Sequence, residues 1–357
     1  MPRLLCGAML AVALLPTTGC SGQSGAARAT PDNRHRLDHR QLPPSTAAPQ
    51  PEHDDSTDRL QWLMWYTFTG RSFVSRGSRA LDDAHTSLFL ERNLSQLSPG
   101  RPSVYSLTED RALWNETAMK ENKRRRKTQP GGAGLGELSA LPSDWLAQID
   151  SVAFTVLSRG GVRGLMLGDE LLCRGVPPTN LSSVTEELRK RLPRSIWLWT
   201  NECESVHELG GSRGGRSKAV PWWSPDLDVV SIDLYEFPTG KMLGVEEADH
   251  VRRYYEHYIF PLLSPHQNVA VVPGLFADSL EQHHHNRSEQ DEALCSKLAS
   301  YQLWIQTEPR IVGMAPFHWD TFSDANDSTP AVFRRGGEGF PKLLKQVAQL
   351  RHSIKNE

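Results

Sequence analysis

The chain has few cysteines, almost no net charge and no long apolar run beyond its N-terminal region. Five cysteines in 357 residues are too few to hold a fold together without a hydrophobic core. Forty lysines and arginines against 42 aspartates and glutamates give a formal charge of −2, which provides no overall field for binding nucleic acid or an anionic membrane. No segment after residue 24 is apolar enough to span a bilayer. Function must therefore depend on local sites of a globular protein.

Signatures of metals and nucleotide cofactors are also scarce. The sequence has no Cys-x-x-Cys, and the three consecutive histidines 283–285 lie in a polar stretch typical of a solvated loop, so we predict no metal site. No Gly-x-Gly-x-x-Gly follows the first predicted strand and no Walker loop is present, so we predict no cofactor. The basic run 123–127 lacks interleaved aromatic residues, which favours an exposed loop over a nucleic-acid platform.

The N-terminal region predicts export. Residues 1–24 carry Arg3, an apolar run and then small residues, the layout of a secretory signal peptide. The triplet that ends in Cys20 resembles a bacterial lipoprotein cleavage box, which makes a lipid anchor at this cysteine the less favoured alternative. Residues 25–57 contain five prolines and few large aliphatic residues, so they predict a disordered linker. A single catalytic domain is then expected over 58–357.

Acceptor triplets for N-glycosylation support the same localisation. Five of them favour a secreted, extracellular glycoprotein with the acceptors in exposed loops, at Asn93, Asn115, Asn180, Asn286 and Asn326. Cys173 and Cys203 each follow a predicted strand, and the sequence leaves open whether they form a disulfide or remain free buried thiols.

Short apolar runs alternate with helical patterns from residue 59 onward, which indicates parallel strands covered by helices. Seven strands are predicted, with helices near 80–97, 143–158, 181–192, 244–263, 289–307 and 340–352. An eighth strand would lie within 108–142, which makes 164–170 the fourth strand. We therefore expect an α/β fold of the (β/α)8 TIM-barrel type, with a doubly wound open sheet as the alternative. The predicted strands are 62–68, 103–107, 164–170, 196–202, 228–237, 269–275 and 311–319.

Several predicted strands end in acidic residues, and the carboxyl ends of barrel strands build the reactive face. The fourth ends with Asp169 and Glu170, the next with Asn201 and Glu202, and the sixth carries Asp233. Counting alternate residues back along the fourth strand places Glu170 on the lumen side, and the same count places Asp233 and Tyr235 there.

Tryptophans suggest a sugar-binding surface, since the C–H faces of sugars pack on indole rings. Trp319 ends the last strand on the lumen side, whereas Trp222 and Trp223 precede the sixth strand and would form an outer platform. Trp197 and Trp199 are expected to pack against helices. Glycoside hydrolysis is the chemistry that most needs two carboxylic acids and aromatic walls, because one acid protonates the leaving oxygen while the other stabilises or attacks the anomeric carbon.

In these features the chain resembles the glycoside hydrolase superfamily with (β/α)8 catalytic domains, over about residues 59 to 352. The pair Asp169-Glu170 is similar to the Asp-Glu pair of β-hexosaminidases, and Asp233, Tyr235 and Trp319 are similar to residues of chitinase-like barrels. The resemblance implies that Glu170 is the general acid, that Asp169 orients a substrate N-acetyl group, and that Tyr235 and Trp319 line the sugar site.

The sequence also departs from these families. The chitinase signature Asp-x-x-Asp-x-Asp-x-Glu is absent. Asn201-Glu202 resembles the Asn-Glu acid motif of retaining families, but the seventh strand ends at Pro273-Gly274 with no glutamate to serve as nucleophile. An α-amylase-like or α-galactosidase-like arrangement, in which an acid of the fourth strand pairs with Glu202 or Asp233, stays open.

We therefore expect a secreted enzyme that hydrolyses glycosidic bonds and whose partner is a carbohydrate substrate. The alternative is a carbohydrate-binding barrel without turnover. An ester or amide hydrolase is less favoured, because no Gly-x-Ser-x-Gly elbow accompanies His318. The candidate catalytic residues are Glu170, Asp169, Asp233 and Glu202, and the candidate substrate-binding residues are Tyr235, Trp319, Glu236, Trp222, Trp223, Asn201 and His318.

Overall fold

The computed structural model describes residues 61–65, 87, 89–91, 102–107, 113–128, 137–204, 206, 223–234, 245–278, 286–317, 322–324, 332–335 and 339–354. The chain divides into two units, Met1–Pro44 and Ser45–Glu357, and all of these residues lie in the second. The predicted signal peptide (1–24) and linker (25–57) lie outside the described residues, as does Cys20, so these expectations stay predictions.

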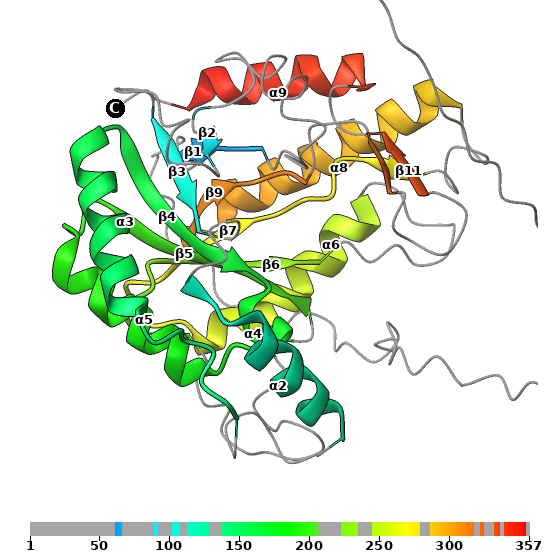
Figure 1. The fold of residues 1–357 in the computed structure, drawn as a ribbon. Coiled ribbons are helices and arrows are strands. Elements are labelled where there is room, and N and C mark those ends of the chain that lie inside the picture. The colour runs from blue at the N-terminus through cyan, green and yellow to red at the C-terminus, as the bar shows by residue number, and fades with distance from the viewer. Residues whose placement is uncertain are drawn as a thin grey trace, which may run out of the picture. The chain divides into compact units, whose positions relative to one another are not determined.

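An eight-stranded parallel sheet forms the centre of the second unit (Figure 1). The strand order is β1-β9-β7-β6-β5-β4-β3-β2, so each strand lies beside its neighbours along the chain and the last pairs with the first. Between β1 and β2, the amide of Ser87 donates to the Leu63 carbonyl at 2.8 Å, and Leu63 donates to Ser87 Oγ at 2.7 Å. The strands are β1 (Trp62–Leu63), β2 (Phe89–Glu91), β3 (Ser103–Ser106), β4 (Val162–Asp169), β5 (Trp197–Cys203), β6 (Val229–Asp233), β7 (Asn268–Val271) and β9 (Ile311–Met314).

This cyclic order is that of a (β/α)8 barrel. The prediction of a TIM barrel is confirmed, as is the position of residues 164–170 in the fourth strand, and the open doubly wound sheet is wrong. A second sheet is antiparallel and orders β10 (Phe322–Asp324), β11 (Val332–Arg335) and β8 (Ala277–Asp278).

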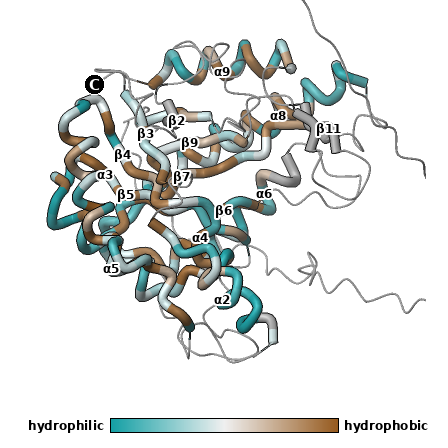
Figure 2. The backbone as a smooth tube through the Cα atoms, viewed as in Figure 1, coloured by the Kyte–Doolittle hydropathy of each residue, from teal (hydrophilic) through white to brown (hydrophobic). Residues whose placement is uncertain are grey.

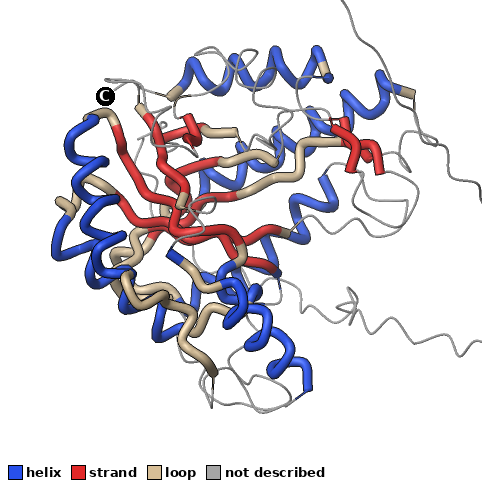
Figure 3. The backbone as a smooth tube through the Cα atoms, viewed as in Figure 1, coloured by secondary structure: helices blue, strands red, loops and turns tan. Residues whose placement is uncertain are grey.

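Helices surround the strands (Figure 3). Their apolar faces pack on the outward-facing strand residues, such as Leu165, Leu198 and Val230, in one continuous hydrophobic layer. The helical segments are α2 (Glu116–Thr128), α3 (Trp145–Arg159), α4 (Leu171–Arg174), α5 (Pro178–Arg191), α6 (Val245–Tyr254), a π-helix at Tyr255–Ile259, a 3-10 turn at Phe260–Leu262, α8 (Arg287–Thr307) and α9 (Pro341–Ser353).

Three tryptophans fill the interior of the barrel near the end at which β1 and β5 begin. Trp62 stacks on Trp197 with ring centroids 5.2 Å apart, and Trp199 lies at 6.0 Å from Trp62. Two glycines make room for these rings, because a Cβ at Gly164 would lie 2.5 Å from the Trp197 indole and one at Gly313 would lie 2.1 Å from that of Trp62. The expectation that Trp197 and Trp199 pack against helices is therefore wrong, since both belong to the lumen cluster.

Two expectations about the first third of the chain are also wrong. The strand that completes the eight is not within 108–142. It is β2, at Phe89–Glu91, within the stretch 80–97 for which the sequence predicts a helix. The interval 108–142 instead contains α2, which includes the basic run 123–127 that was expected to form a loop.

Candidate active site

The end of β4 contains one extra residue relative to β5. Met166 lies opposite Trp199 and Asp169 opposite Asn201, so three steps along β4 match two steps along β5. Such a bulge reverses the alternation of side chains beyond it. Asp169 therefore shares the lumen side with Asn201, and the residue count that placed Glu170 there is wrong.

A chain of hydrogen bonds holds Asp169 in this position. Trp199 Nε1 donates to Ser231 Oγ at 2.7 Å, and Ser231 Oγ donates to Asn201 Oδ1 at 2.6 Å. Asn201 Nδ2 then donates to Asp169 Oδ1 at 2.9 Å. Trp199, Asn201 and Ser231 are fully buried and Asp169 is half-buried. Because Asn201 Oδ1 accepts from Ser231 while Asn201 Nδ2 donates to Asp169, the chain fixes the orientation of the Asn201 amide and presents the carboxylate of Asp169 at the carboxyl ends of β4, β5 and β6.

Glu170 immediately follows the strand and adopts a left-handed backbone with φ of 53°. Non-glycine residues rarely take this conformation, and it is enriched at functional sites. The amide of Glu170 donates to the Asn201 carbonyl at 2.6 Å, which holds the turn in place. Burial raises the pKa of the Glu170 carboxyl, and the negative charge of Asp169 raises it further, while Lys123 and Arg174 act in the opposite direction. Burial and a neighbouring negative charge thus favour the protonated form of Glu170.

Glu202 lies on the opposite side of β5 from Asn201. It is fully buried, and its oxygens accept hydrogen bonds from Thr200 Oγ1 at 2.9 Å and from the amide of Leu172 at 3.0 Å. Burial raises the pKa of Glu202 to about 8, although hydrogen bonds from Thr200 and from the amides of Leu172 and Cys173 oppose the shift. The side chain therefore holds α4 against β5, and the structure does not bring it to the lumen with Asp169.

A disulfide joins Cys173 in α4 to Cys203 at the end of β5, which settles the question that the sequence left open. Cys203 lies opposite Asp233 on β6. Asp233 is half-buried and ends β6 on the same side as Ser231, as the sequence predicts. Its charge, together with burial as the larger cause, raises the pKa of Tyr255. Asp169 and Asp233 thus end their strands on the lumen side, and Glu170 lies on the turn directly after Asp169.

The predicted aromatic platform is not formed by Trp223. This side chain is 4% exposed and packs in the hydrophobic layer beneath the helices, in the segment that enters β6. Such burial leaves no ring face for a sugar, so this expectation is wrong. Five other predicted substrate-binding residues lie outside the described residues: Tyr235, Trp319, Glu236, Trp222 and His318.

Sequence reasoning gave no role to Ser231 or Trp199, although both belong to the hydrogen-bonded chain. The signal was present, because Trp197, Trp199 and Asn201 occupy alternate positions of one strand and must therefore share a side. Ser231 was placed on the lumen side by the same alternation, but a lone serine carries no chemical signature.

Three of the predicted glycosylation acceptors lie at the beginnings of helices. Asn115 is exposed and its Oδ1 accepts from Ala118 at 3.1 Å at the start of α2, while Asn286 caps α8 and its Oδ1 accepts from Glu289 at 3.0 Å. Asn180 Oδ1 accepts from the Ala140 amide at 2.7 Å. The other two acceptors, Asn93 and Asn326, lie outside the described residues. Use of any acceptor stays a prediction.

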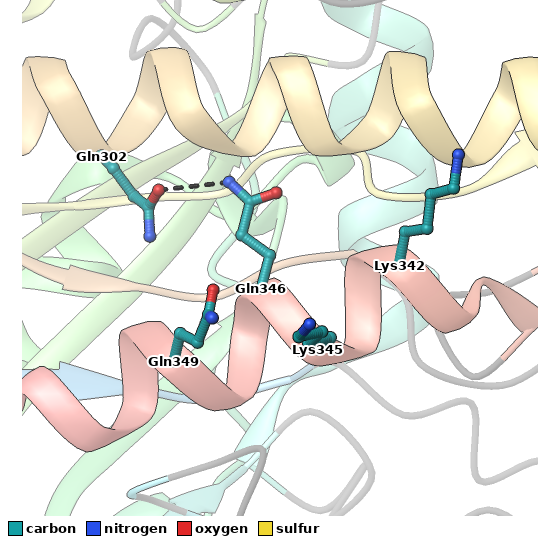
Figure 4. Close-up of a pocket in the computed structure, with 5 residues that line it drawn as sticks. All are labelled: Gln302, Lys342, Lys345, Gln346 and Gln349. Atoms are coloured by element: carbon teal, nitrogen blue, oxygen red, sulfur yellow. Dashed lines mark hydrogen bonds between the residues drawn. The ribbon is translucent and has the colours of Figure 1, made fainter.

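No group of three or more His, Cys, Asp and Glu side chains is placed to hold a metal ion among the described residues. None of the helices described there is long and apolar enough to cross a membrane. A surface groove of about 420 Å³ lies between α8 and α9, where Gln346 donates to Gln302 at 3.3 Å (Figure 4). It contains none of the predicted site residues.

The fold and these strand-end carboxylates place the chain among (β/α)8 barrels with an acidic mouth. No protein-family model matches the chain, and no curated protein matches it. Solved structures with a similar fold include a β-galacturonidase of Eisenbergiella tayi, at 11% identity and a TM-score of 0.48, covering 84% of this chain and 52% of that one. A β-D-glucuronidase of Dictyoglomus thermophilum has 10% identity and a TM-score of 0.45, covering 83% and 50%.

A third similar structure is the N-terminal endo-1,4-β-D-xylanase 10B of Clostridium thermocellum, at 10% identity and a TM-score of 0.45, covering 82% of this chain and 66% of that one. This chain thus spans between half and two thirds of the length of these three structures. The names are those of glycoside hydrolases, and at such low identity the likeness concerns the fold. The barrel assignment itself rests on the strand pairing.

Proposed function

We propose that the protein is a secreted glycoside hydrolase that cleaves glycosidic bonds of an oligo- or polysaccharide. One observation carries the proposal: the buried chain from Trp199 through Ser231 and Asn201 fixes the carboxylate of Asp169 beside Glu170, whose pKa is raised. A positioned carboxylate next to a carboxyl group with a raised pKa is the kind of pair that glycosidic cleavage uses.

In this mechanism Glu170 donates its proton to the glycosidic oxygen as the bond to the anomeric carbon breaks. Asp169 faces the developing positive charge of the sugar, and its charge contributes to the raised pKa of Glu170. Asp233 is the second carboxylate and activates water. Asp233 ends β6, two strands from β4, which Glu170 follows directly, and two strand spacings amount to about 10 Å. Inverting enzymes hold their acid and base carboxyl groups roughly 6.5–9.5 Å apart, so the proposal predicts this separation for Glu170 and Asp233.

Secretion is part of the proposal. The layout of residues 1–24 and the five acceptor triplets support it, and the Cys173–Cys203 disulfide adds support because such bonds persist in oxidising compartments. Expression of the full chain in a eukaryotic secretory host should release a glycosylated product into the medium. An unglycosylated product that stays in the cell would count against this part.

The enzymatic test compares Glu170→Gln and Asp169→Asn with the wild type for reducing-end release from a panel of polysaccharides. Each variant should lose at least about a hundredfold in rate, the usual scale for removing a general acid. Glu186→Gln is the matched control, because Glu186 is a half-exposed residue on the outer helix α5. Unchanged turnover by Glu170→Gln on a confirmed substrate would exclude Glu170 as the proton donor.

One observation favours a second candidate, a carbohydrate-binding barrel without turnover. The residues that follow β7 are Val272, Pro273 and Gly274, and none of them is acidic. The Glu202 carboxyl group accepts the amide of Leu172 in α4 and faces that helix. The described mouth therefore has fewer carboxylates than the strand ends suggest. Saccharide binding that survives Asp169→Asn, with no release of reducing ends from any substrate, would select this candidate.

A further inference from the structure

The helix α2 is fixed to the turn that follows the candidate catalytic pair. Arg126 of α2 donates to the Leu172 carbonyl and, at 3.1 Å, to the Val176 carbonyl. Asn122 donates to the Gly175 carbonyl at 3.0 Å. Gly175 itself permits the contact, because its φ is +109° and a Cβ there would lie 2.1 Å from the carbonyl oxygen of Met119. Figure 1 shows α2 and α4 next to each other, in agreement with these contacts.

This helix is strongly basic. Its sequence ETAMKENKRRRKT has six basic and two acidic residues, and Figure 2 shows it as one of the hydrophilic stretches of the chain. Glu116 pairs with Lys120, and Glu121 pairs with Arg124 and Arg125. Arg126 pairs with Glu137. Among the described residues no acidic side chain forms an ion pair with Lys123. The positive charge of Lys123 lowers the pKa of Glu170, against the larger effect of burial.

A second exposed cation belongs to α4, the helix that follows Glu170. Arg174 ends α4, and its guanidinium lies 3.5 Å from the carbonyl oxygen of Asp169, the last residue of β4. Its charge also acts on Glu170. No ion pair with Arg174 is formed within the described ranges. Two cations from two different elements therefore flank the Asp169–Glu170 pair, with most of their N–H groups directed to solvent.

We propose that Lys123 and Arg174 form a subsite for the acidic group of an anionic saccharide, a uronate carboxylate or a sulfate ester. This inference rests on the proposed function and names its substrate class. A mouth that contains Asp169, Glu170 and Asp233 repels an anionic sugar unless cations compensate. The planar fork of an arginine binds a carboxylate or sulfate through two parallel hydrogen bonds, and a lysine adds a second point charge.

The subsite would also couple binding to chemistry. Lys123 and Arg174 lower the pKa of Glu170 while the mouth is empty, against the effects of burial and Asp169. A bound anion neutralises the two cations, so it removes the influence that withdraws the proton. An acidic substrate would therefore favour the protonated form of Glu170 that donates to the glycosidic oxygen, and a neutral substrate would not.

The test measures binding by calorimetry with three probes. These are the tetrasaccharide of galacturonate, its fully methyl-esterified and therefore neutral counterpart, and a sulfated galactan tetrasaccharide. The wild type should bind at least one acidic probe about tenfold more tightly than the ester, and this preference should weaken as salt rises from low to physiological strength. The acidic probe that binds more tightly identifies the group, carboxylate or sulfate.

The double variant K123Q/R174Q should lose the preference, and both replaced side chains are exposed, so the fold should persist. The control is Arg194→Gln, which removes one exposed positive charge elsewhere, because Arg194 is 68% exposed and lies just before β5, where the strands begin. The control should keep the preference. Equal affinity of the wild type for acid and ester, no binding of either acidic probe, or an unchanged preference in the double variant would overturn the subsite.

The two proposals can fail separately. Charge-dependent binding that is lost in K123Q/R174Q, without any bond cleavage, would leave the subsite standing and refute the hydrolase. Cleavage of neutral polysaccharides that depends on Glu170, with no preference for acidic probes, would leave the hydrolase standing and refute the subsite.

Discussion

Glu202 allows a quantitative prediction about stability. The side chain is fully buried and its pKa is raised from 4.5 to about 8, with burial as the main cause. The unfolded chain releases this proton near pH 4.5, whereas the folded protein keeps it until about pH 8. Folding is therefore favoured by Glu202 in its protonated form, and this contribution is lost as the pH rises through the interval between the two values.

The magnitude follows from the size of the shift. One pKa unit corresponds to about 1.4 kcal/mol, so a rise from pH 5 to pH 8 should lower the free energy of unfolding by about 4 kcal/mol through this one group. The variant Glu202→Gln imitates the protonated carboxyl. Its amide oxygen can accept from Leu172, and its amide nitrogen can donate to Thr200 Oγ1, but the side chain has no proton to lose.

The assay is urea unfolding at pH 5, 6, 7 and 8 with the disulfide intact, followed by the fluorescence of the buried lumen tryptophans. Other groups titrate in both proteins, so the quantity of interest is the difference between wild type and variant at each pH. Glu202→Gln should be close to the wild type at pH 5 and more stable than it at pH 8. Glu186→Gln, at an exposed position, should show no such divergence.

Parallel pH curves for the wild type and Glu202→Gln would refute the reasoning. They would mean that Glu202 ionises normally and that its carboxyl is reached by water. The proposed structural role of Glu202, which is to hold α4 against β5, would then be wrong. Glu202 would again be a candidate catalytic carboxylate.

Two further predictions concern the barrel interior and the disulfide between Cys173 and Cys203. Gly313→Ala should destabilise the fold by about 1–3 kcal/mol, because the added Cβ would lie 2.1 Å from the Trp62 indole, and thermal unfolding would measure it. No change would mean that the indole moves aside freely. The double variant C173S/C203S should lose about 3.6 kcal/mol, the chain-entropy value for a crosslink that spans 30 residues. A urea midpoint equal to that of the wild type would contradict this value.

Much of the barrel could be predicted from the sequence because seven of its strands are distinct apolar runs. The missing strand shows the limit of this signal. β2 has only three residues, Phe89–Glu91, within a leucine-rich stretch whose spacing also fits a helix. Nothing local distinguishes so short a strand, and only its pairing with Ser103–Tyr105 of β3 defines it.

The lumen residues were harder to predict, because their environment comes from distant parts of the chain. Trp197 and Trp199 looked like helix-facing residues, since a barrel interior has little space for indoles. The space exists because Gly164 and Gly313, on two other strands, have no side chains to fill it. The bulge before Asp169 was hard to predict for the same reason. It depends on how the residues of β4 pair with those of β5, and the sequence of either strand alone does not indicate it.

Asn201 and Glu202 show how such tertiary constraints decide between functional hypotheses. The two residues resemble an Asn-Glu acid motif, but neighbours on a strand point to opposite sides. Trp199, two positions before Asn201, donates to Ser231 inside the barrel, and this bond fixes which side of β5 faces the lumen. Asn201 must then face Asp169, and Glu202 must face α4. A motif that requires Glu202 in the mouth does not fit the side of β5 on which this side chain lies, and we therefore propose Glu170, on the turn that Asn201 holds, as the proton donor.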